Sequence, residues 1–483
     1  MPRHLLTLCL VAVLCLPGHS AGATPADATR LPDIGDAAGQ VITPAEERQI
    51  GREYMRNVRM ALKLRDDPII VDYLQNLAEL LVSQVDGYEQ PITMFLVDDA
   101  SINAFAGPGG YIGVHTGLIV SAEKEGELVS VLAHELAHVV QRHLLRSVER
   151  GKKVELATLA AMVAAIVIGS QNPQAGQAML SGTLAGSVQQ QLNYSRQYEQ
   201  EADRIGINMM TRAGYDPRDM VSFFEKLQSS NRYAGLHAVE MLQTHPLTLS
   251  RIADARNRAE QSPRIHAHGE QEFQLIKVRT LSLDQDPVTF LKSLDELAIS
   301  PAAHRYGEAL AAEKSGNFER ARSLIAQLIK EDPHRLLYPY TAGEIELAAQ
   351  RPAAARQRLQ SALTLYPQNA LLSGLLAKAL LDEGRPAEAS ALLAEQLRLS
   401  PSRRLYALHA QAAKAAGQLS AAYHSLAELA YLDGNTLQAI DYLEQAIAET
   451  GDNTYRRLAL QARLQAWKDE VKNAARETAT EAL

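Results

Sequence analysis

The sequence predicts a mainly α-helical protein in two parts, a helical domain that carries a small β-sheet and a following solenoid of paired helices. Three observations support this fold class. Amphipathic helical patterns in the first part surround a β-branched stretch and a Gly-rich passage. One of these helical patterns contains the sequence His-Glu-x-x-His. From about residue 300, prolines and small residues recur every 34 positions. A chain of 483 residues exceeds one hydrophobic core, so we expect two or three domains.

The first residues predict an export signal. Arg3 gives a short basic region, Leu5 to Leu16 is almost wholly apolar, and Ala21-Gly22-Ala23 offers small residues for cleavage. We therefore expect residues 1–23 to be a signal peptide that is cleaved after Ala23. An apolar run of about a dozen residues is short for a membrane span, which needs about twenty.

Cysteine content and charge exclude other classes of protein. Cys9 and Cys15 both lie in the predicted signal peptide, so the mature chain would have no thiol and no disulfide. Any metal ion would have to be held by nitrogen and oxygen atoms. The chain carries 48 basic and 56 acidic residues, a net charge of −8, which disfavours nucleic acid as a partner.

Two helices and a hairpin open the first domain, which we place at residues 24–265. Thr43-Pro44-Ala45-Glu46 is a capping box with proline at the first helical position, and predicts a helix to about Leu62. Asp67-Pro68 starts a second helix. Ile92 to Val97 reads as a strand, and Asn103 to Val114 as a Gly-rich hairpin. Its second strand, Tyr111, Ile112, Gly113 and Val114, could offer backbone groups to an extended peptide substrate; an ordinary tight hairpin is the alternative.

The sequence His134-Glu135-Leu136-Ala137-His138 predicts half of a zinc site. Residues four apart lie one above the other on a helix, so both imidazoles can reach one metal ion. Glu135 is placed beside the water on that metal, where a proton acceptor is needed. A buried helix with two incidental histidines is disfavoured, because an apolar core does not supply partners for these groups. His143 lies off the shared face, and we expect it to be structural.

A second acidic helix is expected to supply the third ligand. Glu199 and Glu201 both compete for that role. Glu199 has Asp203 four residues on, so one face would carry a ligand and a carboxylate that accepts the second N–H of a metal-bound imidazole. We therefore choose Glu199 as ligand and Asp203 as the orienting residue. Between the two helices, the apolar run Leu159 to Ile168 is too short to cross a bilayer and predicts a buried helix or a lid.

The second part, residues 301–483, has the 34-residue period of tetratricopeptide repeats. Four series of residues keep this interval: Pro333, Pro367 and Pro401; Ala321, Ala355 and Ala389; Ala309, Gly343 and Ala377; Ile325, Leu359 and Leu393. The next unit is one residue shorter, and a last helix, about Tyr455 to Ala475, should cap the stack. Residues 266–300 are expected to connect the two parts. Such solenoids bind peptides or proteins in a curved groove, although the array could also merely stabilise the first domain.

These motifs together resemble a known family. His134-Glu135-x-x-His138 with Glu199-x-x-x-Asp203, preceded by Asn103-Ala104-Phe105-Ala106 and Gly109-Gly110-Tyr111, resembles the gluzincin family that contains HtpX and the CAAX prenyl endopeptidases. Within it, the chain looks like the BepA-like subgroup of periplasmic proteases joined to tetratricopeptide repeats. The resemblance implies a zincin-like metalloprotease domain with one zinc ion per chain. It also implies work in the periplasm, in the quality control and assembly of outer-membrane proteins near the barrel-inserting machinery.

The resemblance also gives a role to His245 in Thr244-His245-Pro246-Leu247. In BepA-like relatives a histidine at this position lies at the metal and can occupy its fourth site, which blocks the water. His245 could do the same, or it could donate a hydrogen bond to the oxyanion of the tetrahedral intermediate. A surface histidine in a His-Pro turn is the remaining alternative.

The predicted activity is peptide-bond hydrolysis by a zinc-activated water, with Glu135 moving the proton. The substrates would be misfolded or stalled outer-membrane proteins, with possible chaperone activity in their assembly. The rival is a non-proteolytic periplasmic chaperone or adaptor, in which the repeats act and the metal site is structural or kept shut by His245.

Overall fold

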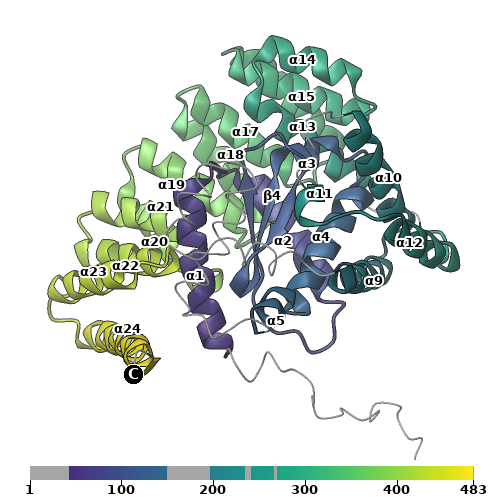
Figure 1. Cartoon of the computed structure of the whole chain (residues 1–483). Coiled ribbons are helices and arrows are strands. Elements are labelled where there is room, and N and C mark those ends of the chain that lie inside the picture. Colours follow the sequence, from purple (N-terminus) through teal and green to yellow (C-terminus); the bar gives the residue numbers. More distant parts are fainter. Residues whose placement is uncertain (1–42, 150–195, 234–240, 266–268, 482–483) are drawn as a thin grey trace, which may run out of the picture.

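The computed structural model describes residues 43–149, 196–233, 241–265 and 269–481. The predicted signal peptide, residues 1–23, and the apolar run Leu159 to Ile168 lie outside the described residues. Figure 1 shows the sheet and its helices on one side of a curved array of helix pairs. Among the described helices, none is both long enough and apolar enough to span a membrane.

The two predicted N-terminal helices are present and begin at their predicted caps. Helix α1 is Pro44–Ala61, and both hydrogen bonds of the capping box between Thr43 and Glu46 form. Helix α2 is Pro68–Val82, where the Asp67 carboxylate accepts from the first free backbone N–H groups. Because α2 buries Leu74, Leu77 and Leu81 while α1 buries Ile50, Tyr54 and Val58, the two helices cover different parts of the core.

The sheet has four strands in the order β1-β2-β4-β3. Strands β1 (Leu64–Arg65) and β3 (Ala104–Ala106) are its edges, and β2 (Thr93–Val97) pairs in parallel with β4 (Tyr111–His115). The predicted hairpin is confirmed: β3 pairs antiparallel with β4 through the short helix η2 (Pro108–Gly110). Gly113 is required in β4 because a Cβ atom there would lie 2.5 Å from the ring of Phe105 and 2.7 Å from that of Phe95.

The predicted peptide-binding role of Tyr111, Ile112, Gly113 and Val114 is wrong for a geometric reason. These residues form β4, whose backbone is paired with β2 on one side and with β3 on the other. A strand with two neighbours has no free N–H or C=O groups for a third. Within the described residues, the edge on this side of the sheet belongs to β3.

The His-Glu-x-x-His sequence lies in a helix, as predicted, and the structure shows that this helix is buried. Helix α4 (Glu125–Val140) is buried along nearly its whole length. It is preceded by α3 (Thr116–Ser121) and followed by α5 (His143–Glu149). It packs against α9 (Arg196–Arg212), α10 (Arg218–Tyr233) and α2. Helices α11 (Met241–Thr244) and α12 (Leu249–Gln261) complete this half.

Glu125, the first residue of α4, makes the stability of the folded chain depend on pH. Glu125 is buried between the hydroxyls of Tyr73 and Tyr215, which donate hydrogen bonds of 2.7 and 3.1 Å. Burial raises the pKa of Glu125 to about 7, with Glu272 and Glu270 adding to the rise against the two tyrosine hydrogen bonds. A raised carboxyl pKa means that the folded state binds the proton more tightly than the unfolded state. The stability from this group is therefore present at low pH and is lost between about pH 4.5 and 7, a change of about 3 kcal/mol at most.

Glu125→Gln, which resembles the protonated form, should raise the melting temperature at pH 8 and change it little at pH 5. Thermal unfolding of both proteins at the two pH values measures this difference. An equal shift at both pH values would contradict the pKa assignment.

The second half is an array of helix pairs with the predicted period. The proline positions 333, 367 and 401 each follow the end of the second helix of a pair. The bounds are α13 Glu270–Asp284, α14 Pro287–Glu296, α15 Pro301–Lys314, α16 Phe318–Glu331, α17 Leu337–Ala348, α18 Pro352–Leu365, α19 Ala370–Asp382, α20 Pro386–Leu399, α21 Arg403–Ala415, α22 Leu419–Leu432, α23 Thr436–Ala448 and α24 Thr454–Glu481. The predicted connector, residues 266–300, contains α13 and α14, and α13 packs on both α3 and α15.

The array contacts the first domain at both of its ends. At the near end, Arg279 of α13 is buried and binds Asp67 at the start of α2 and Glu344 of α17, each at 2.8 Å. At the far end, Arg52 of α1 forms an ion pair with Glu470 of α24 and lies 4.6 Å above the ring of Tyr431. Figure 1 shows α1 between the sheet and these last repeats.

Candidate metal centre

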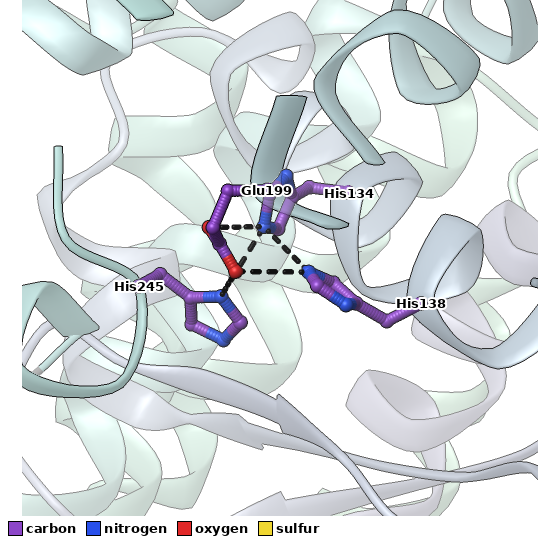
Figure 2. A group of neighbouring side chains, drawn as sticks. All are labelled: His134, His138, Glu199 and His245. Carbon is purple, nitrogen blue, oxygen red and sulfur yellow. Dashed lines mark hydrogen bonds and ion pairs between the residues drawn. The ribbon is translucent and has the colours of Figure 1, made fainter. Parts of the chain in front are cut away.

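Four buried side chains from three separate segments converge on one point (Figure 2). His134 and His138 come from α4, Glu199 from α9, and His245 from the turn after α11. His134 Nε2 lies 3.1 Å from His138 Nε2 and 3.3 Å from His245 Nδ1. Glu199 Oε1 lies 3.0 Å from His245 Nδ1 and 3.4 Å from His138 Nε2. The structure thus brings together the three residues predicted as ligands and His245, which is buried rather than on a surface turn.

These separations fit the coordination shell of a small metal ion. In a tetrahedral site with metal–ligand distances of about 2.0–2.1 Å, the ligand atoms lie about 3.3–3.4 Å from one another. The four separations above, together with 3.5 Å between His134 Nε2 and Glu199 Oε2, scatter closely around that value. Three imidazole nitrogens and one carboxylate oxygen are also a donor set that a divalent transition metal accepts.

His134 is oriented by Asp203, as the spacing predicts. Its Nδ1 atom lies 3.0 Å from Asp203 Oδ1, which leaves Nε2 directed at the other three side chains. Asp203 is one turn beyond Glu199 on α9, so one helix supplies both carboxylates. A carboxylate behind an imidazole fixes both the ring plane and the position of its proton.

Arg251 is part of the centre and was not foreseen from the sequence. This residue of α12 is buried, donates to both oxygens of Asp203 at 2.7 and 2.8 Å, and lies 2.8 Å from Glu199 Oε2. Its guanidinium therefore offsets part of the negative charge of the two carboxylates that face His134. No periodicity distinguishes Arg251 from the other arginines of α12, since only the folded chain brings α12 against α9.

The buried charges shift the pKa values of these groups in a consistent way. Burial raises the pKa of Glu199, but the neighbouring histidines outweigh it and hold the pKa well below its usual value. Burial likewise raises the pKa of Asp203, and the hydrogen bonds from Arg251 and His134 bring it below normal. Burial lowers the pKa of His134, yet Asp203 and Glu199 raise it to about 10. The two carboxylates thus favour positive charge at this point, either on an imidazole or on a cation that takes the place of its proton.

Glu135 lies next to the cluster and not within it. It is fully buried, and its Oε1 atom is 3.4 Å from Nε2 of His245. Burial raises the pKa of Glu135 above its usual value, against the opposing effect of His245 and His134. A carboxylate with a raised pKa beside a metal site is suited to accept and return a proton.

Comparison with known proteins agrees with this geometry. Residues 71–259 match the family model described as peptidase family M48, and residues 306–370 and 346–412 match models of tetratricopeptide repeats. The predicted combination of a gluzincin-type protease domain with these repeats is therefore confirmed.

Relatives match over most of the chain. The beta-barrel assembly-enhancing protease of Escherichia coli (strain K12) is 37% identical over 390 residues, which are 80% of this chain and 80% of the relative. That of Yersinia pestis is 34% identical over 450 residues, 92% of each chain. Mitochondrial metalloendopeptidase OMA1 of Saccharomyces cerevisiae is 30% identical over 173 residues, 35% of this chain and 47% of the relative. The chain is therefore a metalloendopeptidase of peptidase family M48 and belongs with the beta-barrel assembly-enhancing proteases.

Proposed function

We propose that this chain is a zinc-dependent endopeptidase of the periplasm that degrades misfolded or stalled outer-membrane proteins and assists their assembly. One observation carries the proposal: four nitrogen and oxygen donors are buried together at separations of 3.0–3.5 Å, with the carboxylate of Glu135 beside them. His134, His138 and Glu199 would hold the zinc ion. The predicted signal peptide and the names of the matching relatives support the compartment and the substrate class.

Each residue of the site has a separate role in the proposed hydrolysis of a peptide bond. A bound zinc ion supplies the Lewis acidity that lets water lose a proton near neutral pH. Glu135 takes that proton and later gives it to the leaving amine. Asp203 holds His134 in the correct tautomer, and Arg251 lowers the pKa of Asp203 and so keeps it ionised.

We propose that the substrate peptide binds along β3, in place of the rejected role for β4. In the antiparallel ladder of β3 and β4, Gly107 donates to Tyr111 and His115 donates to Asn103. Since hydrogen-bonded and non-bonded pairs alternate, the backbone groups of Ala104 and Ala106 point away from β4. The backbone of Ala106 hydrogen-bonds the carboxyl of Glu135, so a peptide that added here as a further strand would lie beside the proposed base. Ala106 and His138 also line one small cavity of about 20 Å³, which supports a peptide site beside the metal centre.

His245 is proposed to hold the site in a closed state. Its Nδ1 atom lies among the donors, and its Nε2 atom faces Glu135, so one imidazole occupies both the fourth ligand position and the space beside the base. Water and substrate need these positions. This arrangement is also what favours the second candidate function, a chaperone or adaptor whose metal site stays shut.

His245→Ala should raise proteolysis several-fold and leave one zinc ion bound by the remaining three ligands. The measurement is cleavage of casein and of an unfolded outer-membrane protein, together with zinc content by atomic emission. Leu249→Ala serves as the control, because Leu249 follows the same turn and its side chain is exposed. If neither the parent nor the His245→Ala protein cleaves either substrate while both hold zinc, the proteolytic function is contradicted, and suppression of aggregation of the unfolded outer-membrane protein then tests the chaperone function.

The repeat array is proposed to recruit these substrates or to dock the enzyme at the outer-membrane barrel-assembly machinery. Tetratricopeptide arrays present curved surfaces for other proteins, which supports a protein partner. Fractionation of cells for the mature chain tests the compartment, and crosslinking from the surface of the array tests the partner. Recovery of the chain only from the cytoplasm would contradict the proposal.

A further inference from the structure

A further histidine, His143, lies outside the four-donor cluster and directly behind His138. His143, the first residue of α5, is fully buried, and its Nδ1 atom lies 2.9 Å from Nδ1 of His138. Its Nε2 atom lies 3.3 Å from Oε2 of Glu201. His138 thus stands between the four-donor cluster, which its Nε2 atom faces, and a further imidazole backed by a carboxylate.

The positions of the protons follow from these contacts. His138 can bind a cation through Nε2 only if that nitrogen carries no proton, so its proton must be on Nδ1. Two nitrogens 2.9 Å apart need one donor and one acceptor, and His143 must therefore accept at Nδ1. The proton of His143 is then on Nε2, where it points at the Glu201 carboxylate. The position of the proton in the first hydrogen bond therefore fixes its position in the second.

The local fold holds His143 in the position that these two hydrogen bonds require. On a continuous helix, residues five apart differ by about 140° in direction, and His143 would point away from His138. Helix α4 instead ends at Val140, and Arg142 adopts a left-handed conformation with φ of 50°, so that α5 starts in a new direction. The ring of Tyr198 stacks on that of His143 with centroids 4.5 Å apart and an angle of 14°. The imidazole is therefore fixed in its plane by a neighbour of Glu199.

We propose that His143 and Glu201 are positioning residues, which act through His138 and fix its tautomer and ring orientation for metal binding. The inference rests on the proposed metal-dependent function of the same centre. It gives each of the two histidines of α4 a carboxylate behind it: Asp203 acts on His134 directly, and Glu201 acts on His138 through the imidazole of His143. Glu201, the alternative candidate for the third ligand, thus supports His143 from outside the cluster and is not a ligand itself.

The test separates the acceptor atom of His143 from its bulk. His143→Leu keeps an apolar side chain of similar size but removes the acceptor, and should weaken zinc binding by about 10–100-fold. His143→Asn places an amide oxygen near the position of Nδ1 and should restore most of that affinity, although it fills less space. His409→Leu is the matched control, because His409 is also buried and hydrogen-bonded but lies in the repeats. Zinc affinity is measured by competition with a chromophoric chelator, and the geometry of the site by the visible spectrum of the Co²⁺-substituted proteins.

The expected result is a weaker, spectrally altered site in His143→Leu, with recovery in His143→Asn and no change in His409→Leu. Glu201→Ala should lower the affinity in the same direction. Equal losses in the Leu and Asn variants would show that only the volume of the imidazole matters and would overturn the assignment. Undiminished affinity in His143→Leu would overturn it as well, while the proposed function stood. A parent protein that binds no zinc, or binds it equally well as His134→Ala, would overturn both.

Discussion

Glu135→Gln should reduce proteolysis by about 10²–10⁴-fold and leave the bound zinc and the fold in place. The substitution keeps the shape of the side chain and removes its ability to accept a proton. Glu135 lies outside the cluster of donors, so its loss should not release the metal. Because Glu135 is a buried carboxylate whose pKa burial raises, a neutral amide at this position should not lower stability.

The measurement is the rate of casein cleavage in the His245→Ala background, where the site is expected to be open, together with zinc content and melting temperature. Glu225→Gln is the control, since Glu225 is exposed and pairs with Arg256 at the surface. Cleavage at the parental rate by Glu135→Gln would show that another group moves the proton. Loss of zinc along with activity would instead place Glu135 among the ligands.

Arg251→Met should lower the stability of the protein by about 3–5 kcal/mol, the usual effect of removing one partner from a buried ion pair. The guanidinium makes three contacts of 2.7–2.8 Å with Asp203 and Glu199, and all three side chains are buried. Without it, the two buried carboxylates lose their guanidinium partner, and among the described residues histidines are the cationic groups that remain in contact with them. A bound cation restores part of the balance, so added zinc should raise the melting temperature of this variant more than that of the parent.

Arg204→Met is the matched control for this prediction. Arg204 and Asp254 join the same two helices, α9 and α12, at a distance of 3.1 Å, but both side chains are partly exposed. A surface pair contributes about 0–1 kcal/mol, so this variant should melt close to the parent. Similar melting temperatures for both variants would show that the buried arginine does not stabilise the centre.

Local sequence signals predicted the features that depend on short stretches of chain. The capping box at Thr43 and the 34-residue period of the repeats each act within one or two helices, and both are confirmed. The placing of Glu199 and Asp203 on one helical face also follows from spacing alone, and the structure shows both beside His134.

The features that the sequence did not reveal depend on chain reversals or on distant contacts. Spacing along a continuous helix directs His143 away from His138, but the left-handed conformation of Arg142 turns the chain and brings the two imidazoles together. The role given to β4 assumed an open strand, but the parallel pairing with β2 closes its second edge. Arg251 reaches the centre only because α12 packs on α9, and no pattern within α12 records that contact.

The ion pair between Arg52 and Glu470 joins residues that are 418 positions apart. During synthesis from the N-terminus, α1 is complete long before its partner in α24 exists. Individual repeats can fold by local contacts, whereas this closure must wait for nearly the whole chain. The docking of α1 on the last repeats should therefore be a late and slow step of folding, and this junction should be the first to open when the two ends of the chain are pulled apart.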